Sequence, residues 1–282
     1  MSARTAALSA GAMCAFAANS LLCRAALGAG VIDGLSFTAL RLVAGALVLA
    51  ALARGVAAPG SESGSWRAAL ALFGYAIAFS LAYSRIGVGL GALAAFGAVQ
   101  VTMVGAALAR GYRPAGAEWA GFALAVLGLV GLTLPGLARP DALGLALMIT
   151  AGACWGAYSL IGKSGGAPLP ANAAAFARTV PLALLALAVG TAWTAPHLSA
   201  RGAALAVVSG AVTSGLGYAV WFAALRGLRA TQAALIQLSV PPLAAAGGLL
   251  WLKEAPSPRL VVCGALILGG IGLGLLARGR DA

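Results

Sequence analysis

The side chains of this sequence that could recognise a small molecule are aromatic rings and neutral amides inside apolar segments. Trp155 stands among alanines and glycines, three residues before Tyr158. Tyrosine hydroxyls and amides need hydrogen-bond partners in apolar surroundings, and a hydrated cavity supplies them. We therefore expect a cavity for an apolar or aromatic solute with a neutral or zwitterionic polar end. Its expected lining is Phe16, Asn19, Tyr75, Phe79, Tyr83, Gln100, Trp155, Tyr158, Tyr218 and Gln237.

The same residues have a second interpretation, in which they only hold helices together. Tyr75, Phe79 and Tyr83 recur every four residues, so they share one helix face, as helix packing also requires. Amides in apolar segments also form hydrogen bonds between helices. The sequence leaves both interpretations open.

Catalytic and metal-binding arrangements are missing from the sequence. The single histidine, His197, follows the seventh apolar segment, so no serine inside a segment has a histidine at helical spacing. The cysteines lack metal-ligand spacing and behave as small hydrophobic residues; they are Cys14, Cys23, Cys154 and Cys263. We therefore predict no catalytic residue, no metal and no cofactor.

The acidic residues lie in loops or at the ends of apolar segments. They are Asp33, Glu62, Glu118, Asp141, Glu254 and Asp281. Proton-coupled pumps commonly hold a carboxylate within the membrane, where it can bind a proton or a cation. The sequence predicts no such carboxylate here, and Glu254 beside Lys253 is interpreted as a solvated pair at a membrane interface.

The elements that must position these residues are membrane-spanning helices. The chain of 282 residues is 62% hydrophobic and 9% charged, with a mean hydropathy of +0.99, whereas a soluble domain has about a quarter of its residues charged. Apolar runs of about twenty residues, enough to cross a bilayer as helices, follow one another. The predicted spans are 6–26, 34–54, 66–84, 88–109, 116–135, 141–162, 173–194, 202–222, 231–252 and 259–277. The predicted fold is an all-α integral membrane protein in contact with the lipid bilayer.

The last five spans repeat the pattern of the first five. Residues 14–24 (CAFAANSLLCR) and 153–163 (ACWGAYSLIGK) share residue types along their length, with Phe16 opposite Trp155. Because each copy holds five spans, an odd number, the second copy enters the membrane from the opposite side. We predict two inverted five-helix repeats, 1–138 and 139–282, which give a transporter alternating access to the two sides. Pro181 and Pro241 are candidate hinges, since each removes a helical hydrogen bond within a span.

The charges indicate how the chain is oriented. A net charge of +12 would suggest nucleic acid as a partner in a soluble protein, but here more Lys and Arg lie on the side of the N-terminus. That bias places both termini in the cytoplasm, and no nucleic-acid partner is expected. Arg41 lies about 10 Å into its span at 1.5 Å per residue, where we favour a side chain that extends back to the interface. Trp66, Trp119, Trp193, Trp221 and Trp251 are expected in the interfacial belt.

Several of these features together resemble a known family. An arginine stands early in the second helix of each half, Arg41 and Arg178, and the ninth helix reads Gln237-Leu-Ser-Val-Pro-Pro, then Leu250-Trp-Leu-Lys-Glu254, followed by Gly264 in the tenth. This pattern resembles the EamA-type members of the drug/metabolite transporter superfamily over essentially the whole chain. Within it, length and aromatic content look like the bacterial aromatic amino-acid exporters of the YddG type. The fourth helix departs from the pattern, ending in Arg110-Gly111 instead of a glutamate.

The resemblance implies a secondary transporter in the bacterial inner membrane that exports small neutral or aromatic amino acids. Without a membrane-buried carboxylate, transport is interpreted as facilitative, although the sequence does not settle the coupling or the oligomeric state, and a monomer is compatible with it. One alternative is export of other neutral, drug-like metabolites. From a different class, the alternative is a membrane-embedded lipid-handling enzyme, which would require an inward-facing catalytic cluster.

Overall fold

The fold is a bundle of membrane-spanning helices. The computed structural model describes residues 1–54, 56, 65–86, 88–134, 141–164, 167–251 and 257–277, with only the backbone of Val88 and Trp251. Within these residues, ten helical segments are long and apolar enough to cross a membrane. The only strand pairing described there is an isolated bridge between Ile32 and Leu198.

Seven spans are single helices and three are composite. The single helices are α2 (Gly34–Ala53), α3 (Trp66–Tyr83), α4 (Val88–Ala109), α5 (Gly116–Thr133), α6 (Ala142–Ser164), α7 (Pro168–Thr191) and α12 (Pro258–Leu276). The first span joins α1 (Ala3–Cys23) to the π-helical η1 (Arg24–Gly28). The eighth joins α8 (Ala200–Val208), the π-helical η3 (Ser209–Leu216) and α9 (Gly217–Leu225), and the ninth joins α10 (Ala230–Gln237) to α11 (Val240–Trp251).

The ten predicted spans are confirmed, with shifts of a few residues at their ends. The largest shift is in α7, which begins at Pro168 instead of residue 173. Proline fits the first turn of a helix because the amide that it lacks would have no partner there.

Polar residues in the connections fix where several helices begin. The side chains of Ser2, Asp33, Ser65, Ser199 and Ser257 each accept a hydrogen bond from a backbone amide in the first turn of α1, α2, α3, α8 and α12. Such caps satisfy amides that have no partner within the helix, which matters most at a membrane boundary.

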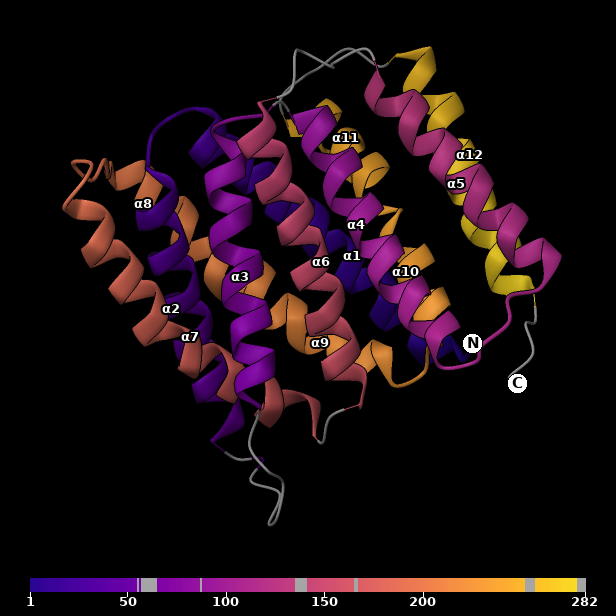
Figure 1. Cartoon of the computed structure of the whole chain (residues 1–282), viewed down its shortest axis with the longest axis horizontal. Helices are drawn as coiled ribbons and strands as arrows, with labels where there is room; N and C mark the ends of the chain where they lie inside the picture. The colour runs from indigo at the N-terminus through magenta and orange to yellow at the C-terminus, as the bar shows by residue number, and fades with distance from the viewer. Residues whose placement is uncertain are drawn as a thin grey trace.

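The helices pack in pairs that run through the whole bundle. α5 packs against α12 at one end of the bundle, and α2 packs against α7 at the other (Figure 1). Between them, α6 contacts α3 and α4, while α1 contacts α9 and α11. Further contacts join α3 to α7, α2 to η3, and α4 to α10. α1 begins and α12 ends on the same side (Figure 1), which we call the terminal side.

The two candidate hinges lie in different settings. Pro181 is inside α7. Pro241 is the second residue of α11, just after the chain leaves α10 at Gln237, so the ninth span is broken ahead of its prolines. A hinge role for either proline remains a prediction.

Trp221 does not lie in the interfacial belt that the sequence predicts for it. The side chain of Trp221 is fully buried, and its Nε1 donates to Ser159 Oγ at 3.1 Å. The expectation of an interfacial Trp221 is therefore wrong, because α9 turns this ring toward α6. Trp66, Trp119 and Trp193 are exposed, the last with 84% of its surface. The side chain of Trp251 and the pair Lys253 and Glu254 lie outside the described residues.

Candidate functional site

A cavity with a volume of ≈ 360 Å³ lies among α1, α3, α4, α6 and the ninth span. In mid-span it is lined by aromatic side chains, with Trp155 and Tyr218 among them. It extends to the exposed residues Arg24, Ser257 and Arg259, near the last turns of the first span and the start of α12. Those residues are on the side opposite the terminal side, and we call this the open side. We refer to the whole space as the aromatic cavity.

Trp155 is the centre of the aromatic group. Its ring centroid lies 5.2 Å from that of Phe16, 5.0 Å from that of Tyr75 and 4.7 Å from that of Tyr218. The indole Nε1 donates to Gln237 Oε1 at 2.5 Å, so helix α6 is tied to α10 at this depth. Trp155 is 6% exposed, and what is exposed faces the cavity.

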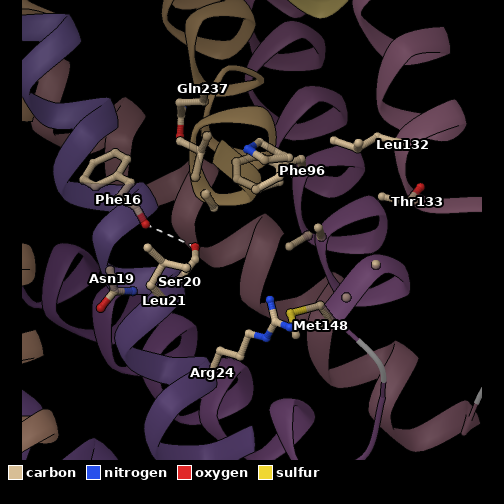
Figure 2. A pocket seen from close by; sticks show the side chains of 18 of the residues that line it. Phe16, Asn19, Ser20, Leu21, Arg24, Phe96, Leu132, Thr133, Met148 and Gln237 are labelled. Atoms are coloured by element: carbon tan, nitrogen blue, oxygen red, sulfur yellow. Dashed lines mark hydrogen bonds between the residues drawn. The ribbon is translucent and has the colours of Figure 1, made fainter. Parts of the chain in front are cut away.

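Most residues predicted for the lining are found there. Phe16, Asn19, Tyr75, Phe79, Tyr83, Trp155, Tyr218 and Gln237 line the aromatic cavity, as does the hinge candidate Pro241. Figure 2 shows Phe16, Asn19 and Gln237 on their helices, with Ser20 bonded to the carbonyl oxygen of Phe16. The two residues from matching positions of the sequence repeat, Phe16 and Trp155, are thus in direct contact.

Two predicted lining residues lie elsewhere. The Tyr158 hydroxyl is hydrogen-bonded to Asn172 Oδ1 on α7, and the Tyr158 ring packs on Phe222 with centroids 4.9 Å apart. Gln100 Nε2 donates to the carbonyl oxygen of Ala234 at 2.8 Å, so this amide joins α4 to α10. The positions of both residues around their helices direct the side chains into helix–helix contacts instead of into the cavity.

The structure adds lining residues that the sequence did not single out. Phe96, Met148 and Arg24 are in the lining, and all three are labelled in Figure 2. Arg259 also lines the cavity, at the start of α12. Arginines near span ends are common in membrane proteins, so the sequence held no specific signal for them. Among the described lining residues there are two guanidinium groups and no carboxylate.

Arg41 is buried behind the cavity wall, with 1% of its surface exposed. Its Nε donates to Ser214 Oγ at 2.9 Å, and its Nη2 donates to the hydroxyls of Tyr75 at 3.1 Å and Tyr218 at 2.6 Å. The expectation that this side chain extends back to the interface is therefore wrong. Hydroxyls from α3 and the eighth span meet the guanidinium inside the protein, which the position of Arg41 in its own helix could not reveal.

The π-helical segment η3 supplies polar side chains that bond to Asn19 and Arg41. Asn19 Oδ1 accepts from Ser209 Oγ at 2.7 Å and from Thr213 Oγ1 at 3.1 Å. A Cβ atom on Gly210 would lie 2.2 Å from the Arg41 carbonyl oxygen, so only glycine lets η3 approach α2 this closely. π-helical turns are rare and frequent at functional sites.

A cluster of charged and polar groups lies on the terminal side of the molecule. Glu118, in the first turn of α5, is 1% exposed and accepts a hydrogen bond from the Tyr112 hydroxyl at 2.6 Å. Arg229, at the start of α10, donates to the same hydroxyl and to the Ala277 carbonyl oxygen at 3.1 Å. Glu118 stands at a span end, as the sequence predicts, but the sequence did not reveal that neighbouring helices bury this carboxylate.

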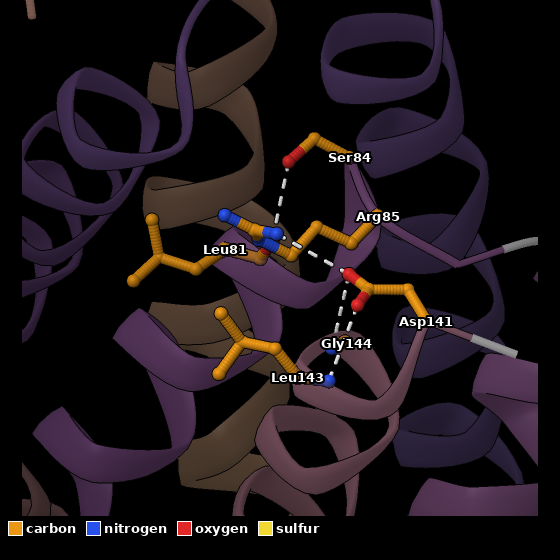
Figure 3. Close-up of polar contacts among 6 residues, drawn as sticks. All are labelled: Leu81, Ser84, Arg85, Asp141, Leu143 and Gly144. Atoms are coloured by element: carbon orange, nitrogen blue, oxygen red, sulfur yellow. Dashed lines mark hydrogen bonds and ion pairs between the residues drawn. The ribbon is translucent and has the colours of Figure 1, made fainter.

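The open side carries an ion pair. Arg85 Nη1 contacts Asp141 Oδ2 at 3.2 Å, just after α3 and just before α6 (Figure 3). Backbone amides of Leu143 and Gly144 also donate to this carboxylate. The hydrogen bond from Arg85, with help from these amides, lowers the pKa of Asp141 below its ordinary value. Both side chains are exposed, so the pair contributes little stability.

Comparison with known proteins identifies the family. Residues 142–276 match the EamA-like transporter family. Over 281 residues the chain is 50% identical to the uncharacterized protein PA1977 of Pseudomonas aeruginosa, covering 99% of this chain and 97% of that protein. The chain belongs to the EamA-like transporter family. It is accordingly a multi-pass membrane transporter and not an enzyme, and the lipid-handling alternative is set aside.

Two further comparisons are more distant. The chain is 34% identical to the threonine/homoserine exporter RhtA of Escherichia coli over 173 residues, which cover 59% of this chain and 57% of that exporter. A solved structure, described only as the crystal structure of a protein, superposes with a TM-score of 0.80 over 97% of this chain and 98% of its own. Its sequence identity is 21%, so it supports the fold alone.

Proposed function

We propose that this EamA-family transporter exports small neutral or aromatic amino acids across the bacterial inner membrane by alternating access. The observation that carries the proposal is the aromatic cavity, which reaches mid-span from the open side and ends at Trp155 and Gln237. Aromatic rings can stack on an apolar side chain, while the amide and hydroxyl groups among them can bond to the polar end of a substrate.

The helix contacts support two inverted repeats, 1–138 and 139–282. Exchanging each span for the one five positions along the chain converts the contact of α3 with α6 into that of α9 with α1. It likewise converts α4 with α6 into α11 with α1, and returns the pairs α5 with α12, α2 with α7, and α4 with α10 to themselves. A pseudo-two-fold axis in the membrane plane produces such a pattern, and such symmetry gives two alternative conformations.

We assign the open side to the outside of the cell. The excess of Lys and Arg on the terminal side favours a cytoplasmic location for both termini. With that orientation the described conformation is outward-open, and the cluster of Glu118, Tyr112 and Arg229 closes the cytoplasmic side. Export then requires this cluster to separate when the cavity opens inward.

The class of amino acid has support from two directions. The partial similarity to the exporter RhtA, whose name gives threonine and homoserine, favours small neutral amino acids. The seven aromatic rings of the lining favour aromatic amino acids, as does the resemblance of the sequence to YddG-type exporters. The largely apolar wall also fits the alternative substrates, neutral drug-like metabolites. The seven rings belong to Phe16, Tyr75, Phe79, Tyr83, Phe96, Trp155 and Tyr218.

The test is transport by purified protein in proteoliposomes. Labelled L-phenylalanine and L-threonine are followed with and without a pH gradient, using Trp155→Ala to disrupt the cavity and Trp193→Ala as the control. Trp193 is exposed outside the spans, so we expect its variant to transport normally while Trp155→Ala is inactive yet folded. Failure to move either amino acid would reject the substrate class. Accumulation that depends on the pH gradient would reject facilitative transport.

A further inference from the structure

Arg41 is a positive charge in the interior of the protein, and no carboxylate in the described part of the chain pairs with it. Its hydrogen-bond partners are three hydroxyls, and Nη1 is buried with no partner among the described residues. A buried charge is costly unless it is paired as well as hydrogen-bonded. The guanidinium also cannot lose its proton to escape this cost.

The described acidic residues do not compensate this charge. Glu118 is committed to Tyr112 on the terminal side, while Asp33 and Asp141 cap or precede helices at the opposite boundary. The lining of the aromatic cavity holds no carboxylate in the described chain. The missing negative charge can therefore come from a ligand.

The contacts of Arg41 lead directly to the cavity. Both tyrosines that accept hydrogen bonds from Nη2 also line the aromatic cavity, and both pack against Trp155. The Arg41 guanidinium carbon additionally lies 5.3 Å from the centroid of the Tyr75 ring. Since each hydroxyl oxygen accepts from Arg41, its hydrogen is directed away from the guanidinium and can be donated to another acceptor.

We propose that Arg41, through the hydroxyls of Tyr75 and Tyr218, forms the subsite that binds the carboxylate of the transported solute. Arg41 is a positioning residue that fixes the two phenols and supplies the positive potential, and the phenols are the groups that touch the ligand. This inference rests on the proposed transport of amino acids. It restricts the substrates to solutes with a carboxylate and argues against uncharged metabolites.

The subsite predicts discrimination between an amino acid and its amide. A hydrogen bond to a charged group contributes about 1.5–3 kcal/mol, which corresponds to about a tenfold or larger preference. In proteoliposomes we expect unlabelled L-phenylalanine to inhibit uptake of labelled L-phenylalanine at a concentration at least about tenfold lower than L-phenylalaninamide does. The same comparison is made with L-threonine and its amide.

Variants locate the source of that discrimination. In Tyr75→Phe and Arg41→Gln the preference for the acid over the amide should fall to about twofold or less. Tyr158→Phe removes a buried hydroxyl bonded to Asn172, and Arg178→Gln removes an arginine that lies over the Trp66 ring at 5.8 Å. Both controls should retain the preference. A purely structural role of Arg41 would weaken acid and amide together and leave their ratio unchanged.

A second measurement covers variants that no longer transport. The shift in melting temperature caused by each ligand on purified protein gives the same ratio without turnover. If wild-type protein transports neither amino acid, the proposed function fails. If it transports an amino acid but recognises the amide equally, or if Tyr75→Phe keeps the full preference, the carboxylate subsite alone is overturned.

Discussion

The cluster on the terminal side makes a strong prediction about conformation. Tyr112→Phe removes the hydroxyl that donates to Glu118 and accepts from Arg229, without changing the ring. Those groups belong to the start of α5, the start of α10 and the connection after α4. The helices that close this side therefore lose a shared polar contact.

The size of the effect follows from the two bonds lost. Each involves a charged group, and such a bond contributes about 1.5–3 kcal/mol. The carboxylate of Glu118 would keep no hydrogen-bond partner among the described residues, because Oε1 already lacks one. Taking a net loss of about 2 kcal/mol for the closed terminal side, the population open on that side rises about 30-fold.

Maleimide labelling measures this change through Ser9→Cys, in a protein whose four native cysteines are replaced. Ser9 is buried on α1, seven residues before the cavity residue Phe16 and so near the same helix face. It lies between the cavity and the terminal side. We expect Tyr112→Phe to raise its labelling rate about 30-fold, in line with the population shift.

The control is Tyr83→Phe, which removes a hydroxyl bonded to the Ser20 carbonyl oxygen, far along the span from the terminal-side cluster. It should leave labelling at Ser9 unchanged. A folded Tyr112→Phe protein that labels at the parental rate would refute the idea that this cluster holds the terminal side closed.

Three more predictions concern stability, measured by thermal unfolding in detergent. Gly152→Ala places a Cβ 2.2 Å from the Ala95 carbonyl oxygen and should cost about 1–3 kcal/mol, whereas Gly97→Ala, with open space around its Cβ, should be neutral. Trp155→Phe leaves a buried amide oxygen without its donor and should also cost about 1–3 kcal/mol. Burial would raise the pKa of Asp33, but its hydrogen bonds, among them those to the first turn of α2, lower it. The stabilisation due to the Asp33 charge should therefore be present above its unfolded pKa of about 3.9 and disappear as pH falls through the lower folded pKa. In Asp33→Asn, whose amide can still cap α2, this pH dependence should be absent.

The sequence predicts the spans well because length and apolar composition alone decide whether a helix can cross a bilayer. It also predicts much of the cavity, since aromatic rings and amides stand out in runs of Ala, Gly and Leu. It does not predict how each helix is rotated about its own axis. That rotation removes Tyr158 and Gln100 from the cavity and brings in Phe96, although all three are ordinary interior residues of their helices.

The hydrogen-bond partners of Arg41 and Glu118 could not be predicted from the sequence for a related reason. Whether Arg41 returns to the interface depends on hydroxyls that other helices bring to it, Ser214 among them, from the other half of the chain. Glu118 looks like an ordinary acid in the first turn of a helix until Tyr112 and Arg229 cover it. The position of a residue along its own helix does not show which side chains of other helices contact it.

The lone charge of Arg41 also has an electrical consequence. In a polarised membrane, a charge that moves along the membrane normal changes free energy by about 2.3 kcal/mol for each 100 mV it crosses. A neutral amino acid brings its ammonium group together with the carboxylate, so the empty and the loaded carrier both hold one net positive charge within the spans. Membrane potential then acts equally on the loaded and the empty step of the cycle, so it changes the rate of transport without changing the direction of net export.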